Sequence, residues 1–119
     1  MDKLIFIVDD NDANLTVAAS ALENEYKVLT MPSAQKMFTL LEKKRPDLIL
    51  LDIEMPEMTG YEAIAKLKEN PQWKEIPVIF LTGLENEDLK SKALEAGALE
   101  VVSKPIVKSI LLERVKNNV

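Results

Sequence analysis

Acidic side chains follow two of the apolar runs in this sequence, and a hydroxyl and a lysine follow two others. Asp9 and Asp10 come directly after KLIFIV, and Asp52 comes directly after LILL. Thr82 follows VIFL, and Lys104 stands shortly after the last apolar run. Carboxylates held close together repel one another, so such a group binds either a proton or a cation. If these side chains meet in space, they form an acidic cation site with a lysine and a hydroxyl beside it.

The composition restricts the chemistry of such a site. The chain of 119 residues has no cysteine and no histidine, which removes thiolate chemistry, the commonest general base and the usual transition-metal ligand. Oxygen ligands alone favour a hard cation such as Mg²⁺, which keeps several waters and takes one or two protein carboxylates. Asp52 is a suitable nucleophile for a phosphoryl group, because Mg²⁺ and the ammonium of Lys104 can neutralise the charge of that group. The Thr82 hydroxyl can donate a hydrogen bond to a phosphoryl oxygen.

The charge and the hydropathy of the chain disfavour several classes of protein. Fifteen Lys and Arg residues against 20 Asp and Glu residues give a net charge of −5, which argues against a nucleic-acid-binding surface. No apolar run approaches the roughly 20 residues of a membrane span, and the start MDKLIFIVDDND turns acidic too early for a signal peptide. We therefore expect one compact domain over residues 1–119, in the cytoplasm, without membrane or nucleic-acid contacts.

Short apolar runs alternate with helical patterns along the chain. The runs predict strands over residues 3–8, 26–31, 48–51, 78–81 and 99–102. Apolar residues at helical spacing within residues 15–22, 34–41, 61–67, 89–96 and 106–115 predict five helices that carry them. Asn11 or Asp12 and Ser33 are N-cap candidates, and Gly97 is a candidate for the end of the fourth helix. This order predicts an α/β fold with a mostly parallel sheet and right-handed crossovers.

The predicted strand ends should bring the chemical groups together. The carboxyl ends of parallel strands lie at one edge of the sheet, where open α/β sheets bind their ligands. Asp9, Asp10, Asp52, Thr82 and Lys104 all fall at such ends, although each taken singly has an ordinary structural explanation, such as an acidic turn, a helix cap or a surface lysine. The bond from Lys104 to the following proline can be cis, which would aim the lysine inward, or trans at the start of the last helix.

The same residues give the chain a resemblance to the receiver domains of bacterial response regulators, including those of chemotaxis. The pattern is a pair of acids after the first strand, LLDIEMPEMTG around Asp52, Thr82 after the fourth strand, and Lys104–Pro105 after the fifth. The resemblance implies a flavodoxin-like, doubly wound sheet of order 2-1-3-4-5 with five helices and a cis Lys104–Pro105 bond. It also implies a Mg²⁺ site made of Asp9, Asp10, Asp52 and the backbone carbonyl of Glu54.

In function, the resemblance implies a signalling module of a two-component system and not an enzyme with its own substrate. A phosphohistidine of a partner histidine kinase or phosphotransfer protein would phosphorylate Asp52, because this chain has no histidine of its own. The domain would catalyse only its own phosphorylation and dephosphorylation. It would signal to a downstream protein or effector domain through the face of the fourth helix, fifth strand and fifth helix, either alone or as part of a longer protein.

One position departs from the family pattern. Three residues before the lysine, where the family usually places Tyr or Phe, this chain has Val101. The usual switch couples Thr82 to that aromatic ring, and Pro105 lies in the same region. Because a β-branched valine has few rotamers, we expect phosphorylation to act mainly through Thr82 and residues 83–88, with modest movement around Val101.

Two other classes of protein also place an acid or a phosphate at this edge. A phosphohydrolase of the haloacid dehalogenase kind would use Asp52 as its nucleophile and Glu54 two positions later, but the chain lacks the Asp-x-Asp-x-Thr run and room for a cap domain. A flavodoxin would bind a flavin phosphate after the first strand, where Asp9, Asp10 and Asp12 would repel it. Sustained turnover of phosphate esters or visible absorbance would identify these alternatives.

Overall fold

Five strands and five helices alternate along the chain in a computed structural model that describes residues 2–83 and 87–119. The strands are β1 (Leu4–Val8), β2 (Lys27–Met31), β3 (Leu48–Asp52), β4 (Val78–Thr82) and β5 (Glu100–Ser103). The helices are α1 (Asp12–Leu22), α2 (Ala34–Leu41), α3 (Gly60–Glu69), α4 (Glu87–Glu95) and α5 (Lys108–Lys116). The predicted alternation is confirmed. No helix in the described part of the chain is long and apolar enough to cross a membrane.

The sheet is parallel throughout and has the order β2-β1-β3-β4-β5, which confirms the predicted flavodoxin-like topology. The chain runs from β1 outward to β2 and then returns to the other side of β1, so the order reverses between β1 and β3. Ligands of open α/β sheets bind at the carboxyl edge beside such a reversal. In the register, Val8 lies beside Leu51 and Asp52 beside Leu81, so β1, β3 and β4 end close together.

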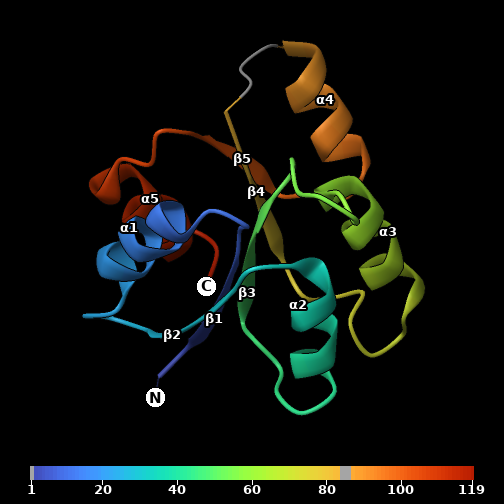
Figure 1. Cartoon of the computed structure of the whole chain (residues 1–119), viewed down its shortest axis with the longest axis horizontal. Coiled ribbons are helices and arrows are strands. Elements are labelled where there is room, and N and C mark those ends of the chain that lie inside the picture. The colour runs from blue at the N-terminus through green and yellow to red at the C-terminus, as the bar shows by residue number, and fades with distance from the viewer. Residues whose placement is uncertain (1, 84–86) are drawn as a thin grey trace.

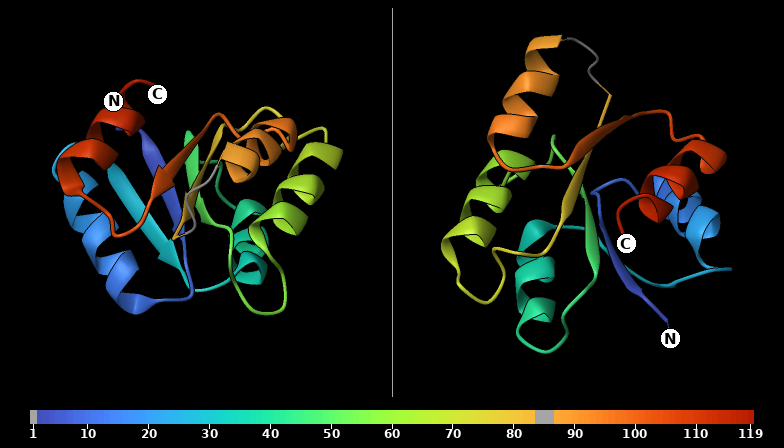
Figure 2. Two further views of the ribbon diagram at one scale, coloured as in Figure 1. Left: turned by 90° about the horizontal axis from the view of Figure 1, so that it is seen from above. Right: turned by 180° about the vertical axis from the view of Figure 1, so that it is seen from behind.

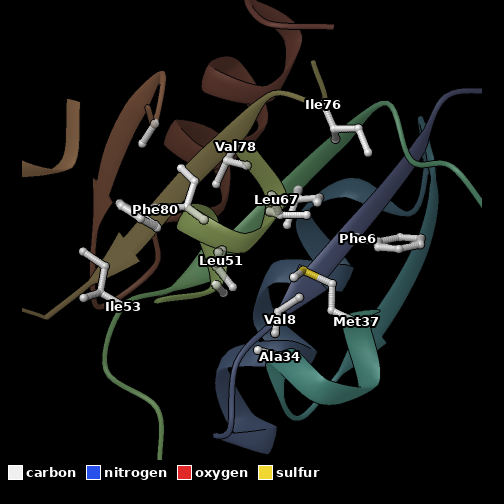
Figure 3. Close-up of a cluster of buried hydrophobic side chains, with 14 of the residues drawn as sticks. Phe6, Val8, Ala34, Met37, Leu51, Ile53, Leu67, Ile76, Val78 and Phe80 are labelled. Carbon is white, nitrogen blue, oxygen red and sulfur yellow. The ribbon is translucent and has the colours of Figure 1, made fainter. Parts of the chain in front are cut away.

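The sheet separates two hydrophobic cores. Helices α1 and α5 cover one face, and α2, α3 and α4 cover the other (Figures 1 and 2). Phe6 and Val8 of β1 point to the α2–α3 side, whereas Ile5 and Ile7 point to the α1–α5 side. Strands β3 and β4 are buried at every position, which explains their continuous apolar runs. Figure 3 shows the core under α2 and α3, which includes Phe6, Val8, Met37, Leu51, Leu67 and Phe80.

The helix ends follow the expected capping rules. The side chains of Asn11 and Ser33 accept hydrogen bonds from backbone N–H groups in the first turns of α1 and α2. Gly97 follows α4 with a φ of 110°, a left-handed conformation that glycine adopts without strain. A reciprocal capping box of Thr59 and Glu62 begins α3 and was absent from the sequence-based prediction.

The last helix differs from its prediction. It begins at Lys108 and not at residue 106, because Val107 has extended backbone dihedrals and acts as the N-cap residue. Leu111 and Val115 are buried, whereas Val107 and Ile110 are 50% and 45% exposed. Only the stripe that carries residues four apart faces the sheet in this short helix. Val107 and Ile110 therefore belong to the surface, whereas Ile106 and Leu112 are partly buried and pack against the core.

Trp73 lies in the connection between α3 and β4, at the amino edge of the sheet. Its ring packs against Phe38 of α2, with the ring centroids 5.6 Å apart. The connection is a series of turns in which the backbone N–H of Trp73 donates to the carbonyl oxygen of Asn70. The only tryptophan of the chain is therefore at the edge opposite to the strand ends that carry the predicted site.

Candidate functional site

The carboxyl ends of β1, β3, β4 and β5 bring the predicted site residues together. Asp9 directly follows β1, while Asp52 and Thr82 are the last residues of β3 and β4. The backbone N–H of Lys104 donates to the carbonyl oxygen of Thr82 at 2.8 Å, which places the lysine just beyond β5 at the same edge. The Lys104–Pro105 bond is cis, as the resemblance implied.

The side chain of Lys104 connects the two buried carboxylates of this group. Its Nζ lies 2.9 Å from Asp9 Oδ2 and donates a hydrogen bond of 2.9 Å to Asp52 Oδ1. Asp9 is fully buried and Asp52 is 1% exposed, so both are shielded from bulk water. The other oxygen of Asp9 accepts a hydrogen bond from the backbone N–H of Asn11. Two buried acids beside one lysine leave an excess of negative charge.

The surroundings of Asp52 change its acidity. Burial, the largest cause, and repulsion by Asp9 and Glu54 raise the pKa of Asp52 from 3.8 to about 6, although the hydrogen bond from Lys104 acts in the opposite direction. Burial lowers the pKa of Lys104, but its hydrogen bonds and charge interactions with Asp52 and Asp9 outweigh this, so its pKa is raised. At pH 7 the lysine is charged and Asp52 is mostly ionised, as a nucleophile requires.

Asp10 completes an acidic cluster with Asp9 and Asp52. One carboxylate oxygen from each of the three lies within 4.8 Å of the others, and Asp10 is exposed whereas the other two are buried. The cluster is therefore closed on the side of Asp9 and Asp52 and open to solvent at Asp10, where a hydrated cation can enter. Its donors are carboxylates alone, which fits a hard cation such as Mg²⁺ and not a zinc or copper site. Lys104 compensates only part of the negative charge.

The side chain of Glu54 makes a contact that the sequence did not predict. Its two carboxylate oxygens each lie 3.3 Å from Thr82 Oγ1, so the hydroxyl donates a long, shared hydrogen bond. Glu54 is exposed and Thr82 is buried. The resemblance to receiver domains implied a role only for the backbone carbonyl of Glu54, because the loop conformation that aims its side chain at β4 has no local sequence signal. Of the predicted switch segment 83–88, residues 84–86 lie outside the described residues.

Gly60 holds the turn after β3 against the start of α3. Its backbone N–H donates to the carbonyl oxygen of Ile53 at 2.8 Å. A Cβ atom at this position would lie 2.6 Å from the carbonyl oxygen of Asp52 and 2.8 Å from Ile53 Cα, so only glycine permits this close approach. The packing therefore fixes the backbone that presents Asp52.

An aromatic ring from α3 packs against the same core as Val101. Val101 is half-buried in β5 beside the core that contains Phe80. Tyr61, in the first turn of α3, lies edge-on to Phe80, with the centroids 5.4 Å apart and an interplanar angle of 72°. The Nζ of Lys92 in α4 lies 4.9 Å from the centroid of the Tyr61 ring. The Tyr61 hydroxyl is buried and has no hydrogen-bond partner among the described residues.

Comparisons with known proteins agree with this arrangement. The family model for the response regulator receiver domain matches residues 5–116. The chain belongs to this family. The receiver domain is 40% identical over 111 residues to a probable cyclic di-GMP phosphodiesterase of Vibrio cholerae, a match that covers 93% of this chain and 25% of that protein. It is 30% identical to the polar-differentiation response regulator DivK of Brucella anthropi, with 98% and 96% of the two chains covered.

Solved receiver structures share the fold over nearly the whole domain. The chemotaxis protein CheY4 of Vibrio cholerae has a TM-score of 0.93 at 25% identity, with 100% of both chains covered. The BeF3-activated receiver domain of DrrB has a TM-score of 0.87 at 32% identity, with 98% of this chain and 97% of that chain covered. The receiver domain spans about a quarter of the phosphodiesterase and of the response regulator PleD of Caulobacter vibrioides.

The two alternative classes gain no support from the fold or the comparisons. A haloacid dehalogenase would need Glu54 as a second acid beside the nucleophile, but this side chain contacts Thr82. A flavodoxin shares the sheet order, but here the loop after β1 carries two acids of the cluster, Asp9 and Asp10. The family match identifies the chain as a receiver domain of a two-component response regulator system.

Proposed function

We propose that this receiver domain accepts a phosphoryl group on Asp52 in a Mg²⁺-dependent reaction. The supporting observation is the position of Asp52, which is a buried strand-end carboxylate beside Asp9 and Asp10 and 2.9 Å from the ammonium of Lys104. Phosphoryl transfer requires positioning and the neutralisation of charge more than covalent chemistry from the protein. These surroundings supply both.

The donor in this proposal is a phosphohistidine of a histidine kinase or a phosphotransfer protein. An oxygen of Asp52 attacks the phosphorus atom, the new O–P bond forms as the N–P bond breaks, and the leaving imidazole takes up a proton from solvent. Lys104 neutralises one phosphoryl oxygen, and the hydroxyl of Thr82 donates a hydrogen bond to another. The domain has no further substrate and catalyses only its own phosphorylation and dephosphorylation.

In this proposal the acidic cluster would hold the metal ion. Asp10 and Asp52 would be direct ligands, with the backbone carbonyl of Glu54 as a third by resemblance to the family, and Asp9 would support them with its charge. When bound, Mg²⁺ neutralises negative charge on the phosphoryl group. The open side at Asp10, which is exposed, leaves room for the waters that Mg²⁺ retains.

The output surface in this proposal is the face of α4, β5 and α5, where a downstream protein or effector domain binds. Four exposed large apolar side chains lie on or next to these elements, and exposed apolar surface marks interaction sites. They are Leu94, Leu99, Val107 and Ile110, which are 45–50% exposed. A hollow of about 260 Å³ between β5 and α5 is lined in part by Val101, Pro105 and Arg114.

Intact mass spectrometry tests the phosphorylation site. With acetyl phosphate and Mg²⁺, the domain should gain the mass of one phosphoryl group, and Asp52→Asn should abolish the gain. Asp2→Asn, which makes the same charge change at an exposed position before β1, should leave the gain intact. A chelator should prevent the reaction of the unmodified domain. An equal gain in the Asp52→Asn protein would exclude Asp52 as the acceptor.

A further inference from the structure

Tyr61 carries a buried hydroxyl that the proposed phosphoryl transfer does not use. Its ring is fixed from two sides, edge-on by Phe80 and over its face by Lys92. The oxygen has no hydrogen-bond partner in the described part of the chain. Because a buried, unpaired hydroxyl is unfavourable, this donor suits an acceptor that reaches it in a second state of the domain.

The carboxylate of Glu54 is the acceptor that the structure offers. Tyr61 contacts Phe80 and Glu54 contacts Thr82, and these two residues are two positions apart on β4, so both contacts lie on one face of the sheet. Burial and the negative charge of Glu54 both raise the pKa of the Tyr61 hydroxyl, which agrees with this placement. Glu54 now accepts the hydrogen bond of Thr82, with both oxygens 3.3 Å from Oγ1. These O–H···O contacts are longer than the usual range of about 2.5–3.0 Å, so they are weak and little is lost when they break. Glu54 is also exposed, which leaves its side chain room to turn.

Phosphorylation sets Glu54 and the phosphoryl group in competition for Thr82. The phosphoryl oxygens are strong acceptors, and they add negative charge to Asp52. That charge repels the Glu54 carboxylate, which already raises the pKa of Asp52 by like-charge repulsion. Glu54 thus loses its donor and is pushed from the site at the same moment, while the Tyr61 hydroxyl is available.

We propose that Glu54 exchanges its hydrogen-bond donor, from Thr82 to Tyr61, when Asp52 is phosphorylated. This inference rests on the proposed function. Tyr61 is then a positioning residue, because it acts through Glu54 and touches no reacting atom. Lys92 over its ring connects the exchange to α4, in which Ala93 is the one buried residue among those described. The ring of Tyr61 thereby supplies a link between site and surface that Val101 does not.

Fluorine NMR on the full chain tests the exchange. The sequence has two tyrosines, so Tyr26→Phe leaves Tyr61 as the only position for fluorotyrosine. Acetyl phosphate with Mg²⁺ should shift the Tyr61 signal, because its hydroxyl gains a charged acceptor, and Glu54→Ala should abolish the shift. A shift of equal size in both proteins would overturn the proposal. So would the absence of a shift in a protein whose intact mass shows phosphorylated Asp52.

The lifetime of the phosphoryl group provides a second readout. Tyr61→Phe keeps the ring and removes only the hydroxyl, so it should change the dephosphorylation rate about threefold or more when Glu54 is present and leave it unchanged in Glu54→Ala. Equal effects in both backgrounds would contradict the exchange. Intact mass separates the two levels of failure. If the chain never gains a phosphoryl group, both proposals are refuted. If it is phosphorylated but the effect of Tyr61→Phe does not depend on Glu54, only the exchange is refuted.

Discussion

Lys104, just beyond β5, donates a hydrogen bond of 2.9 Å to Asp52 at the end of β3, across the intervening strand β4. The lysine is thus the counter-ion of a buried acid and, in the proposed function, also a ligand of the phosphoryl group. Stability and phosphoryl transfer depend on the same side chain, so one substitution should affect both.

Lys104→Gln should lower the free energy of unfolding at pH 8 by about 3 kcal/mol, because it leaves two buried carboxylates without their cation. Phosphorylation of Asp52 by acetyl phosphate should slow about 100-fold. Urea denaturation and intact mass measure the two effects. Lys108→Gln, with the same charge change at an exposed position of α5, is the matched control and should change neither. Equal losses in the two variants would show that the bridge is unimportant.

Asp10→Asn should weaken Mg²⁺ binding at least about tenfold and raise the melting temperature of the metal-free domain, because it relieves repulsion within the cluster. Calorimetric titration and thermal denaturation without metal measure the two effects. Asp12→Asn is the control, since Asp12 is also exposed but lies in the first turn of α1. It should leave Mg²⁺ affinity unchanged and slightly lower stability by removing a favourable helix-dipole interaction. Unchanged Mg²⁺ affinity in Asp10→Asn would exclude this acid as a ligand.

Mg²⁺ affinity should rise with pH through about 6, the raised pKa of Asp52. Below that pH a proton occupies the carboxylate that the metal needs, so affinity at pH 5 should be about tenfold lower than at pH 7. Calorimetry in two buffers of different ionisation enthalpy should also detect proton release near pH 6. Equal affinities at pH 5 and pH 7 would place the titration elsewhere.

The same shift predicts how Asp52 contributes to stability in the metal-free domain. Its pKa is higher in the folded state, about 6 against 3.8, so the folded state binds more protons between these values. The contribution of Asp52 is therefore greatest below pH 4 and is lost as the pH rises through 6. Asp52→Asn should remove this part of the pH dependence, which urea denaturation at pH 4, 5, 6 and 7 can follow. An unaltered pH profile in the variant would contradict the assignment.

Gly60→Ala should destabilise the domain by about 1–3 kcal/mol, since the new Cβ would lie 2.6 Å from the carbonyl oxygen of Asp52. Gly83 offers a matched control, because a Cβ there has no neighbour within 4 Å. Gly83→Ala should leave stability unchanged or raise it slightly by restricting the unfolded chain. Equal stability of the two variants, measured by urea denaturation, would mean that α3 shifts away without cost.

The strands and the converging site were predictable from the sequence because their signals are local and repeated. Each buried strand is a continuous apolar run, and each run ends in a chemical group such as Asp52 or Thr82. Because the strands are parallel, their carboxyl ends all lie at one edge of the sheet. The resemblance to receiver domains supplied the strand order and the cis Lys104–Pro105 bond, both of which are confirmed.

The contacts made by side chains across loops were not predictable in this way. Glu54 reaches Thr82 because of the turn between Asp52 and Gly60, whose conformation depends on a close backbone contact with no periodic signature. The apolar residues near the last helix predicted the helix but not its buried face, and Ile110 and Val107 are exposed because hydrophobicity alone does not show which stripe faces the sheet. Tertiary packing decides both cases.

Trp73 offers an intrinsic optical signal for global unfolding. Its indole packs against Phe38 at the amino edge of the sheet, away from the acidic cluster, and it is the only tryptophan of the chain. Its emission should therefore change when the domain unfolds and remain steady when the cluster binds a cation. A denaturation curve followed at this residue, recorded at several Mg²⁺ concentrations, then yields the affinity of the metal from the stability that it adds, without any label.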